Sequence, residues 1–334
     1  MLLFQKSILS RESVGGMHMT KEIRKTAQAM VADGKGILAM DESHSTIEKR
    51  FKEIGVENTE ENRRKYRQLL ITAPGLGKFI SGAILFDETI RQKTNDGIPF
   101  PKVLEQQGII PGIKVDKGAK PLSLFPNETI TEGLDGLRER LQEYRSLGAK
   151  FAKWRAVITI GKDIPTKACI KANAHALARY AALCQEAGIT PFVEPEVLMD
   201  GSHSIETCLE VTTQTLAIVF KELKALKIDL KGIVLKPNMV VSGISSPDQA
   251  GPEKVAELTI KCFKETVSPK VPGIAFLSGG QSDESATLNL NEMNRKFKGQ
   301  VPWKLTFSYG RALQRAALKA WNGGDANIKA AQEA

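Results

Sequence analysis

The sequence predicts an α/β protein that forms one closed (β/α)8 barrel. Eight short runs rich in Ile, Val, Leu and Phe recur along the 334 residues, and longer helix-like or irregular segments separate them. Strands that alternate with helices pair in parallel through crossover helices, and eight such strands favour a closed barrel. The chain shows no composition break and no long Gly, Ser or Pro linker. We therefore expect a single domain.

The expected strands are, in chain order, "GILAMD" (36–41), "ISGAILF" (80–86), "IPGIKVD" (110–116), "FAKWRAVIT" (151–159), "TPFVEPE" (190–196), "GIVLKPN" (232–238), "GIAFLSG" (273–279) and "WKLTFSY" (303–309). An open, doubly wound sheet is the alternative, and it usually carries a glycine fingerprint after its first strand. The candidate, "PGLGKF" (74–79), fails both nucleotide-binding templates. Ile80 stands at the third glycine of GxGxxG, and Phe79 at the Ser or Thr position of a P-loop. We expect a loop there.

Two intervening segments show helical periodicity. "NAHALARYAALCQEAG" is expected to begin at a cap on Asn173 and to stop at Gly188. "YGRALQRAALKAW" (309–321) is followed by two glycines, which favour the end of a helix. Residues 1–18 are slightly basic and apolar at their start, so we expect a flexible extension before a barrel domain over residues 19–334. An organelle-targeting leader is the alternative.

Composition narrows the function. With 42% hydrophobic and 25% charged residues and no run of about 18 apolar residues, the chain is typical of soluble globular proteins without a membrane span. The net charge of +9 suits an anionic partner, and the scarcity of aromatic residues (6%) favours phosphorylated metabolites over nucleic acid. The cysteines lack metal-ligand spacing and indicate buried thiols in a reducing compartment, so we expect a cytoplasmic location. They are Cys169, Cys184, Cys208 and Cys262.

In such a barrel the active site lies at the carboxyl ends of the strands. Seven of the eight runs place a charged or hydroxyl residue near that end, and only the second run does not. These residues are Asp41, Lys114, Lys153 with Arg155, Glu194 with Glu196, Lys236, Ser278 and Ser308. The two pairs are spaced i, i+2, which points both members of a pair to the same face of a strand. Each residue alone could be the first solvated position of a loop, but together they indicate a functional pocket.

Lys236, in "GIVLKPN", is the residue expected to carry covalent chemistry. A lysine with the ordinary pKa of about 10.4 is almost entirely protonated at pH 7. Burial and a neighbouring cation, for which Lys153 is the candidate, both disfavour the charged form and can activate the amine. Such an amine attacks a carbonyl carbon and forms a Schiff base. The alternative is a structural lysine that is ion-paired to Glu194 or Glu196.

Two glycine-bearing turns are expected to bind an anion. "LSGGQS" follows the seventh run and "SYGRAL" follows the eighth, where phosphate sites of such barrels often form. The backbone N–H groups of Gly279, Gly280 and Gly310, together with the start of a helix, can surround a phosphate. Arg311 supplies a guanidinium that can bind two phosphate oxygens at once.

These motifs closely resemble those of the class I fructose-bisphosphate aldolases, which work through a lysine Schiff base. The chain contains in order "GKGILAMDES", "GIKVDKG", "FAKWR", "VEPE", "LKPNMV", "FLSGGQS", "TFSYGRALQ" and "ALKAW". The resemblance covers about residues 19–334 and implies a TIM barrel, usually a homotetramer, that needs no metal or other cofactor. The implied reaction is the reversible cleavage of fructose 1,6-bisphosphate to dihydroxyacetone phosphate and glyceraldehyde 3-phosphate, a step of glycolysis and gluconeogenesis.

The resemblance also implies a role for each matching residue. Lys236 would form the Schiff base, Glu194 would shuttle protons during iminium formation, and Asp41 would take the hydroxyl proton as the carbon–carbon bond breaks. Lys153 would tune Lys236, and Glu196 would keep the lysines and Glu194 in register. The ketone-side phosphate would contact Ser278, Gly279, Gly280, Ser308, Gly310, Arg311 and Arg50. The other phosphate would contact Lys114, Arg155, Ser43 and Thr46.

Some features depart from the pattern of this family. Thr46 stands where many relatives have serine, which keeps the hydroxyl, and His44 replaces a small or polar residue; we expect little effect from either. The family usually continues through a mobile tail that ends in tyrosine, whereas this chain ends in "NIKAAQEA".

Two other functions are less well supported by the sequence. A metal-dependent class II aldolase is disfavoured because the histidines show no ligand-like spacing. They are His18, His44, His175 and His203. A barrel that binds sugar phosphates without catalysis is disfavoured by the complete set of catalytic-type residues around Lys236. The motifs are compatible with both fructose 1,6-bisphosphate and fructose 1-phosphate as substrates.

Overall fold

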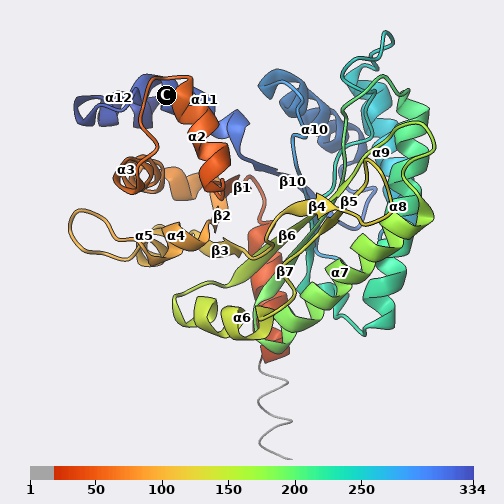
Figure 1. Ribbon diagram of the computed structural model, residues 1–334, viewed down its shortest axis with the longest axis horizontal. Coiled ribbons are helices and arrows are strands. Elements are labelled where there is room, and N and C mark those ends of the chain that lie inside the picture. The colour runs from red at the N-terminus through yellow and green to blue at the C-terminus, as the bar shows by residue number, and fades with distance from the viewer. Residues whose placement is uncertain (1–18) are drawn as a thin grey trace, which may run out of the picture.

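A computed structural model describes residues 19–334 of the chain. All eight expected strands form and pair in parallel as a closed barrel, in the order β1-β10-β9-β8-β7-β6-β3-β2 (Figure 1). Their bounds are β1 (Gly36–Ala39), β2 (Ile80–Leu85), β3 (Ile110–Lys114), β6 (Phe151–Ile158), β7 (Thr190–Val197), β8 (Val234–Leu235), β9 (Gly273–Phe276) and β10 (Lys304–Tyr309). The predicted single-domain barrel is confirmed, while the extension predicted over residues 1–18 lies outside the described residues.

Helices follow the strands and surround the barrel (Figure 1). Residues 19–30 are helical and precede β1. The later helices are α2 (His44–Lys52), α3 (Glu60–Ile71), α4 (Asp87–Arg91), α5 (Phe100–Gln106), α6 (Leu137–Ser146), α7 (Lys167–Glu186), α8 (Ile205–Ala225), α9 (Pro252–Thr266), α10 (Asp283–Phe297), α11 (Arg311–Trp321) and α12 (Ile328–Glu333). Single 3₁₀ turns occur at η1 (Leu76–Lys78), η2 (Leu230–Gly232) and η3 (Asp325–Asn327).

An apolar layer fills the barrel interior at the amino-terminal end of the strands. Phe151 of β6 and Phe192 of β7 pack edge to face, with ring centroids 6.0 Å apart. Gly112 of β3 leaves room for the Phe151 ring, because a Cβ built on Gly112 would lie 2.2 Å from Phe151 Cζ. The helix over residues 19–30 closes this end, since its Ala27 and Met30 belong to the same buried cluster. The space inside the barrel is therefore packed core at its amino-terminal end.

One predicted helix start is wrong. The helix expected from a cap at Asn173 is α7, which begins at Lys167. Its cap is Thr166, seven positions before Asn173, and the Thr166 side chain accepts a hydrogen bond from the N–H of Cys169. Asn173 is buried inside the helix, where its amide donates to the carbonyl of Thr129, 2.8 Å away. A buried asparagine with a tertiary partner can stay within a helix although asparagine favours caps.

The other local predictions are largely confirmed. α11 begins two residues later than expected, because Tyr309 still belongs to β10. It ends at Trp321, as expected, and is followed by Asn322, whose φ of 45° is left-handed. "PGLGKF" forms the short turn η1 before β2, at the barrel end opposite the carboxyl ends of the strands. All four cysteines are buried free thiols, as predicted. A small antiparallel hairpin of β4 (Ala119–Pro121) and β5 (Thr129–Thr131) was not predicted.

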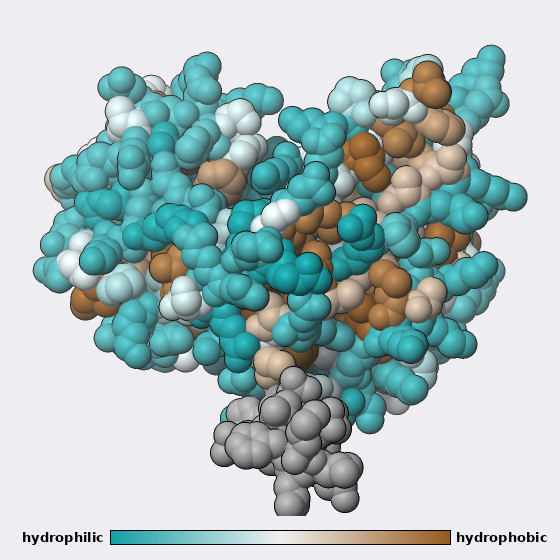
Figure 2. Space-filling model, turned by 60° about the horizontal axis from the view of Figure 1, so that its bottom comes forward, coloured by the Kyte–Doolittle hydropathy of each residue, from teal (hydrophilic) through white to brown (hydrophobic). Residues whose placement is uncertain are grey.

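The surface view in Figure 2 shows a mostly hydrophilic face with apolar residues in small, separate groups. The large aliphatic and aromatic side chains lie mainly in the buried core between the strands and helices. Within the described residues, no helix combines the length and apolar character that crossing a membrane requires.

Candidate active site

Charged side chains form a second layer inside the barrel, next to the apolar layer and nearer the carboxyl ends of the strands. Residues two apart on a strand share a face, so Lys153 follows Phe151 on β6, and Glu194 follows Phe192 on β7, toward the carboxyl end of the barrel. Lys236 stands in the same relation to Val234 of β8. The alternation that buries the aromatic rings therefore also directs these charges inward.

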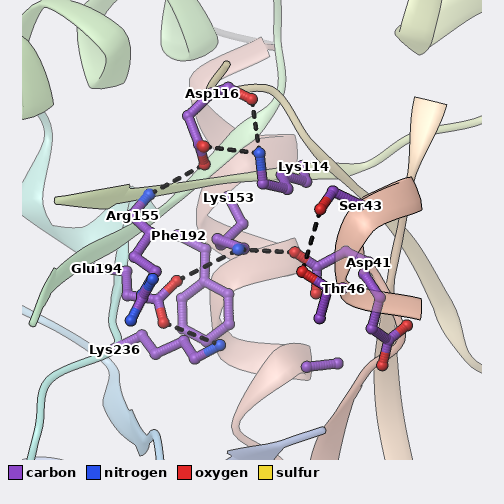
Figure 3. A network of polar contacts seen from close by, with 12 residues as sticks. Asp41, Ser43, Thr46, Lys114, Asp116, Lys153, Arg155, Phe192, Glu194 and Lys236 are labelled. Carbon is purple, nitrogen blue, oxygen red and sulfur yellow. Dashed lines mark hydrogen bonds and ion pairs between the residues drawn. The ribbon is translucent and has the colours of Figure 1, made fainter. Parts of the chain in front are cut away.

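These three charged residues and Asp41 form one ion-pair chain (Figure 3). The Nζ of Lys153 lies 2.7 Å from Oδ2 of Asp41 and 3.5 Å from Oε2 of Glu194. The other carboxylate oxygen of Glu194, Oε1, lies 3.2 Å from the Nζ of Lys236. Lys236 also sits over the Phe192 ring, with 5.8 Å between Nζ and the ring centroid. Glu194 thus joins the two buried lysine side chains, and the apolar layer lies directly beneath them.

The network sets the protonation of its members. Burial alone would raise the pKa of Asp41, but Lys153 and Lys236 outweigh burial and hold this pKa below its ordinary value. Burial disfavours the charged form of Lys153, yet Asp41 and Glu194 raise the pKa of Lys153 overall. Asp41 is therefore a carboxylate and Lys153 an ammonium group at neutral pH.

The pKa of Glu196 is shifted upward, whereas the pKa of Asp41 is shifted downward. Its burial raises its pKa, and the charge of Glu194 adds to this effect, although Arg155 acts against both. The Nε of Arg155 lies 2.5 Å from Oε2 of Glu196. The two residues of the i, i+2 pair on β6 thus form ion pairs with the two residues of the pair on β7. Lys153 pairs with Glu194, and Arg155 pairs with Glu196.

Asp116 is a site residue that the sequence reasoning missed. Its Oδ1 accepts a hydrogen bond from Lys114 Nζ at 2.6 Å, and its Oδ2 accepts from the backbone N–H of Arg155 at 3.2 Å (Figure 3). The Asp116 side chain is only 2% exposed. Its spacing from Lys114 is i, i+2, the same signal that marked the pairs on β6 and β7.

The helix α2 brings the hydroxyl residues and an arginine to the same end of the barrel. Ser43 precedes its first turn, and the Ser43 and Thr46 hydroxyl oxygens are 3.1 Å apart. Arg50, in the last turn of α2, forms an ion pair with the buried carboxylate of Glu42, which is the second residue that the sequence reasoning missed. His44 faces away to Glu88, with 3.2 Å between Nε2 and Oε2.

A cavity of about 1030 Å³ opens at the carboxyl ends of β1, β3 and β6. Eight of the predicted site residues line it: Asp41, Ser43, Thr46, Arg50, Lys114, Lys153, Arg155 and Gly310. The cavity wall does not include the other predicted residues, which are Lys236, Glu194, Glu196, Ser278, Gly279, Gly280, Ser308 and Arg311. Lys236 and Glu194 adjoin it through Lys153, which lines the wall and contacts Glu194.

The two glycine turns lie next to this network. A Cβ built on Gly279 would stand 3.6 Å from Oε1 of Glu196, and Gly279 and Gly280 have φ values of 59° and 98°, a region that favours glycine. Ser308 is buried, and its hydroxyl has no hydrogen-bond partner within residues 19–334. Gly310 directly precedes α11 and lies close to β1, because a Cβ there would stand 3.1 Å from the carbonyl oxygen of Ala39 and 3.9 Å from Arg50 Nη2.

This arrangement joins a buried lysine, carboxylates of differing pKa and several cations. It can support attack of an amine on a carbonyl, with proton transfer through Glu194 or Asp41, and binding of anionic groups by the lining cations. Among the described residues, no group of three or more His, Cys, Asp or Glu side chains is placed to hold a metal ion.

Comparisons with known proteins agree with this chemistry. The family model "Fructose-bisphosphate aldolase class-I" matches residues 22–334. A curated relative from Xanthomonas campestris pv. campestris, "Probable fructose-bisphosphate aldolase class 1", is 63% identical over 302 residues, which are 90% of each chain. "Fructose-bisphosphate aldolase 5, cytosolic" of Arabidopsis thaliana is 55% identical over 311 residues, which are 93% of this chain and 86% of that protein.

A solved structure shows the same fold. It is the fructose-bisphosphate aldolase from Plasmodium falciparum in complex with TRAP and a small-molecule inhibitor, with a TM-score of 0.92 and 50% sequence identity. The match covers 95% of this chain and 91% of that one. On the closed barrel, its buried lysine–carboxylate network and a family match over nearly the whole described chain, this protein belongs to the class I fructose-bisphosphate aldolases.

Proposed function

We propose that Lys236 is the nucleophile with which this aldolase reversibly cleaves fructose 1,6-bisphosphate to dihydroxyacetone phosphate and glyceraldehyde 3-phosphate. The observation that carries this assignment is the buried contact of 3.2 Å between Lys236 Nζ and Glu194 Oε1. A nearby carboxylate can take and return the protons that formation of an imine requires. The same contact fits a structural ion pair, so the two interpretations must be separated by experiment.

The proposed reaction uses each member of the network once. The unprotonated amine of Lys236 attacks the ketone carbon, Glu194 supplies the proton on which the oxygen leaves as water, and a protonated imine remains. Asp41 then takes the proton of the hydroxyl on the far side of the scissile bond. That oxygen forms the aldehyde, and the bonding electrons of the broken carbon–carbon bond move onto the imine to give an enamine.

The later steps reverse the same proton movements. The enamine carbon takes up a proton in exchange for the one that Asp41 holds, water attacks the imine, and Glu194 regains the proton it gave, so that dihydroxyacetone phosphate is released and the Lys236 amine is restored. Lys153, which stays protonated between Asp41 and Glu194, stabilises the negative charge that develops on the substrate oxygens. Glu196 is proposed to keep the lysines and Glu194 in register; its ion-pair partner is Arg155, which stands opposite Glu194 in the β6–β7 register.

The substrate's two phosphates are proposed to bind on opposite sides of Lys153. The ketone-side phosphate would contact the glycine turns and Arg50, together with the helix start at Arg311; the residues are Ser278, Gly279, Gly280, Ser308, Gly310, Arg311 and Arg50. The Ser308 hydroxyl, which has no hydrogen-bond partner within residues 19–334, and the closeness of Gly310 to Arg50 support this placement. The other phosphate would contact Lys114, Arg155, Ser43 and Thr46, all of which line the cavity.

Borohydride trapping tests the covalent step. We expect sodium borohydride, added with dihydroxyacetone phosphate, to label one peptide that contains Lys236, and we expect a chelator to leave cleavage unchanged. Label on another peptide would contradict the assignment of Lys236, and loss of activity on chelation would favour metal-dependent chemistry.

The organisation of the protein in the cell is proposed on the resemblance to the family. We propose that the protein is a homotetramer and that it is cytoplasmic. The name of the Arabidopsis relative states a cytosolic location for that protein, which supports the second proposal. We further propose that residues 19–334 form the barrel aldolase domain. Light scattering of the full chain tests the oligomer, and cleavage activity of a variant that begins at Met19 tests the domain.

A further inference from the structure

A buried glutamine on α11, Gln314, contacts two residues of the cavity wall. They are Arg50 on α2 and Glu42, which lies just before α2. Gln314 is 1% exposed. Its Nε2 donates hydrogen bonds to the carbonyl of Ala39 at 2.7 Å and to Oε1 of Glu42 at 3.0 Å. Its Oε1 accepts from the hydroxyl of Tyr66 at 3.0 Å and from Nη1 of Arg50 at 3.4 Å.

These four contacts use the whole hydrogen-bonding capacity of the Gln314 amide. A primary amide has two N–H donors and two acceptor lone pairs, and each of them has a partner here. The orientation is also determined, because the Ala39 carbonyl and the Glu42 carboxylate can only accept, while the Arg50 guanidinium can only donate. A reversed amide would lose at least three of the four hydrogen bonds in a buried place, where unpaired polar groups are costly.

The amide therefore links Arg50 to the first turn of α11. Arg50 Nη1 bonds both Gln314 and Glu42, while its Nη2 points toward Gly310, where a Cβ would lie 3.9 Å away. Gln314 itself stands in the first turns of the helix that Gly310 precedes. Arg50 is the longest and most flexible of the predicted phosphate ligands on α2, and this contact restricts its position.

We propose that Gln314 is a positioning residue that holds Arg50 and Glu42 at the ketone-side phosphate site and so sets the affinity for that phosphate. This inference rests on the proposed phosphate contact of Arg50. Arg50 does not touch the reacting carbon atoms in the proposed reaction, and the phosphate is bound equally before and during bond cleavage. Loss of Gln314 should therefore raise KM and leave kcat nearly unchanged, as removal of uniform binding does.

The variant Gln314→Met tests this, because methionine keeps the length of the side chain and removes all four hydrogen bonds. We expect KM for fructose 1,6-bisphosphate to rise about tenfold, with kcat changed by less than about twofold. Fructose 1-phosphate carries the same phosphate, so its KM should rise by the same factor. In an Arg50→Met background, Gln314→Met should raise KM by less than about a further twofold, because its effect passes through Arg50.

Two further variants make the test specific. Gln185→Met removes another glutamine that makes two hydrogen bonds, to the backbone of Asp229 before β8, at the end of the barrel away from the cavity, and its KM should equal that of the wild type. Tyr66→Phe removes one donor to Gln314 and keeps the ring, so KM should rise by about two- to fivefold. This variant carries the test if Gln314→Met does not fold.

An unchanged KM in folded Gln314→Met or Tyr66→Phe would overturn the inference, as would a full additional effect of Gln314→Met on top of Arg50→Met. Failure of the proposed function is seen separately, as absence of borohydride label on Lys236 in the wild-type protein. An active wild type with a normal label and an unaffected Gln314→Met variant would reject only the role of Gln314.

Discussion

The Nζ of Lys236 lies 3.2 Å from Oε1 of Glu194, and these side chains are only 6% and 4% exposed. The second oxygen of the same carboxylate faces Lys153 at 3.5 Å. A carboxylate between two lysines can exchange a proton with one of them while the other keeps the local charge balanced. This relationship separates the roles of the two lysines and leads to the predictions below.

Replacement of Lys236 by methionine should remove cleavage and borohydride labelling together. Methionine keeps an apolar stem above Phe192, and Glu194 retains its contact with Lys153, so the barrel should stay folded. A cleavage assay, mass spectrometry of the reduced protein and a thermal unfolding curve measure the three properties. An unfolded Lys236→Met protein would instead support a structural lysine.

The variant Asp41→Asn should separate adduct formation from bond cleavage. The proposed base for cleavage is Asp41, and loss of a general base typically slows a reaction by about 10²- to 10⁴-fold. Labelling of Lys236 by borohydride and dihydroxyacetone phosphate should persist, because that step uses Glu194. Loss of labelling in folded Asp41→Asn, or cleavage at the wild-type rate, would contradict this division of roles.

Lys153 should contribute to stability over the whole neutral range of pH. Its pKa is raised in the folded state, so this contribution is complete below the ordinary value of about 10.4 and is lost only as pH rises through the higher folded value. Lys153→Met leaves Asp41 and Glu194 without their shared ammonium group. We expect the free energy of unfolding at pH 7 to fall by about 3–5 kcal/mol, as for other broken buried pairs.

Acid should partly reverse this loss, because the pKa of Asp41 is held low mainly by Lys153 and rises without it. Urea unfolding of Lys153→Met and wild type at pH 5 and pH 7 measures the difference. Lys304→Met, which removes an exposed partner of Asp33, is the matched control and should change stability little at either pH. A Lys153→Met protein as stable as wild type at pH 7 would show that the ion-pair chain is not stabilising.

Arg155→Gln should weaken binding of the bisphosphate alone. Arg155 is assigned to the phosphate that fructose 1-phosphate lacks, so KM for fructose 1,6-bisphosphate should rise about tenfold or more and KM for fructose 1-phosphate should change less than about twofold. Arg138→Gln is the control, because Arg138 pairs with Glu186 on the outside of the barrel. Equal increases for both sugars would place Arg155 at the ketone-side phosphate or at neither.

Local pattern was enough to predict the barrel and the inward direction of its charges. Apolar runs of strand length define the eight strands, and the two-residue period of a strand puts Lys153 on the same face as Phe151 and Glu194 on the same face as Phe192. Both properties depend only on neighbours within one strand. The chain therefore determined by itself which residues would face the barrel interior.

Tertiary structure decided which of these residues touch. Asp41 contacts Lys153 because barrel closure brings the end of β1 close to β6. The two residues are far apart in the sequence, so the periodicity of a single strand could not predict this contact. Asp116 and Gln314 act through partners on other elements, and Asn173 stays inside α7 because Thr129 receives its hydrogen bond. Contacts between elements depend on how the whole barrel closes and packs, and that is a property of the folded chain rather than of any segment.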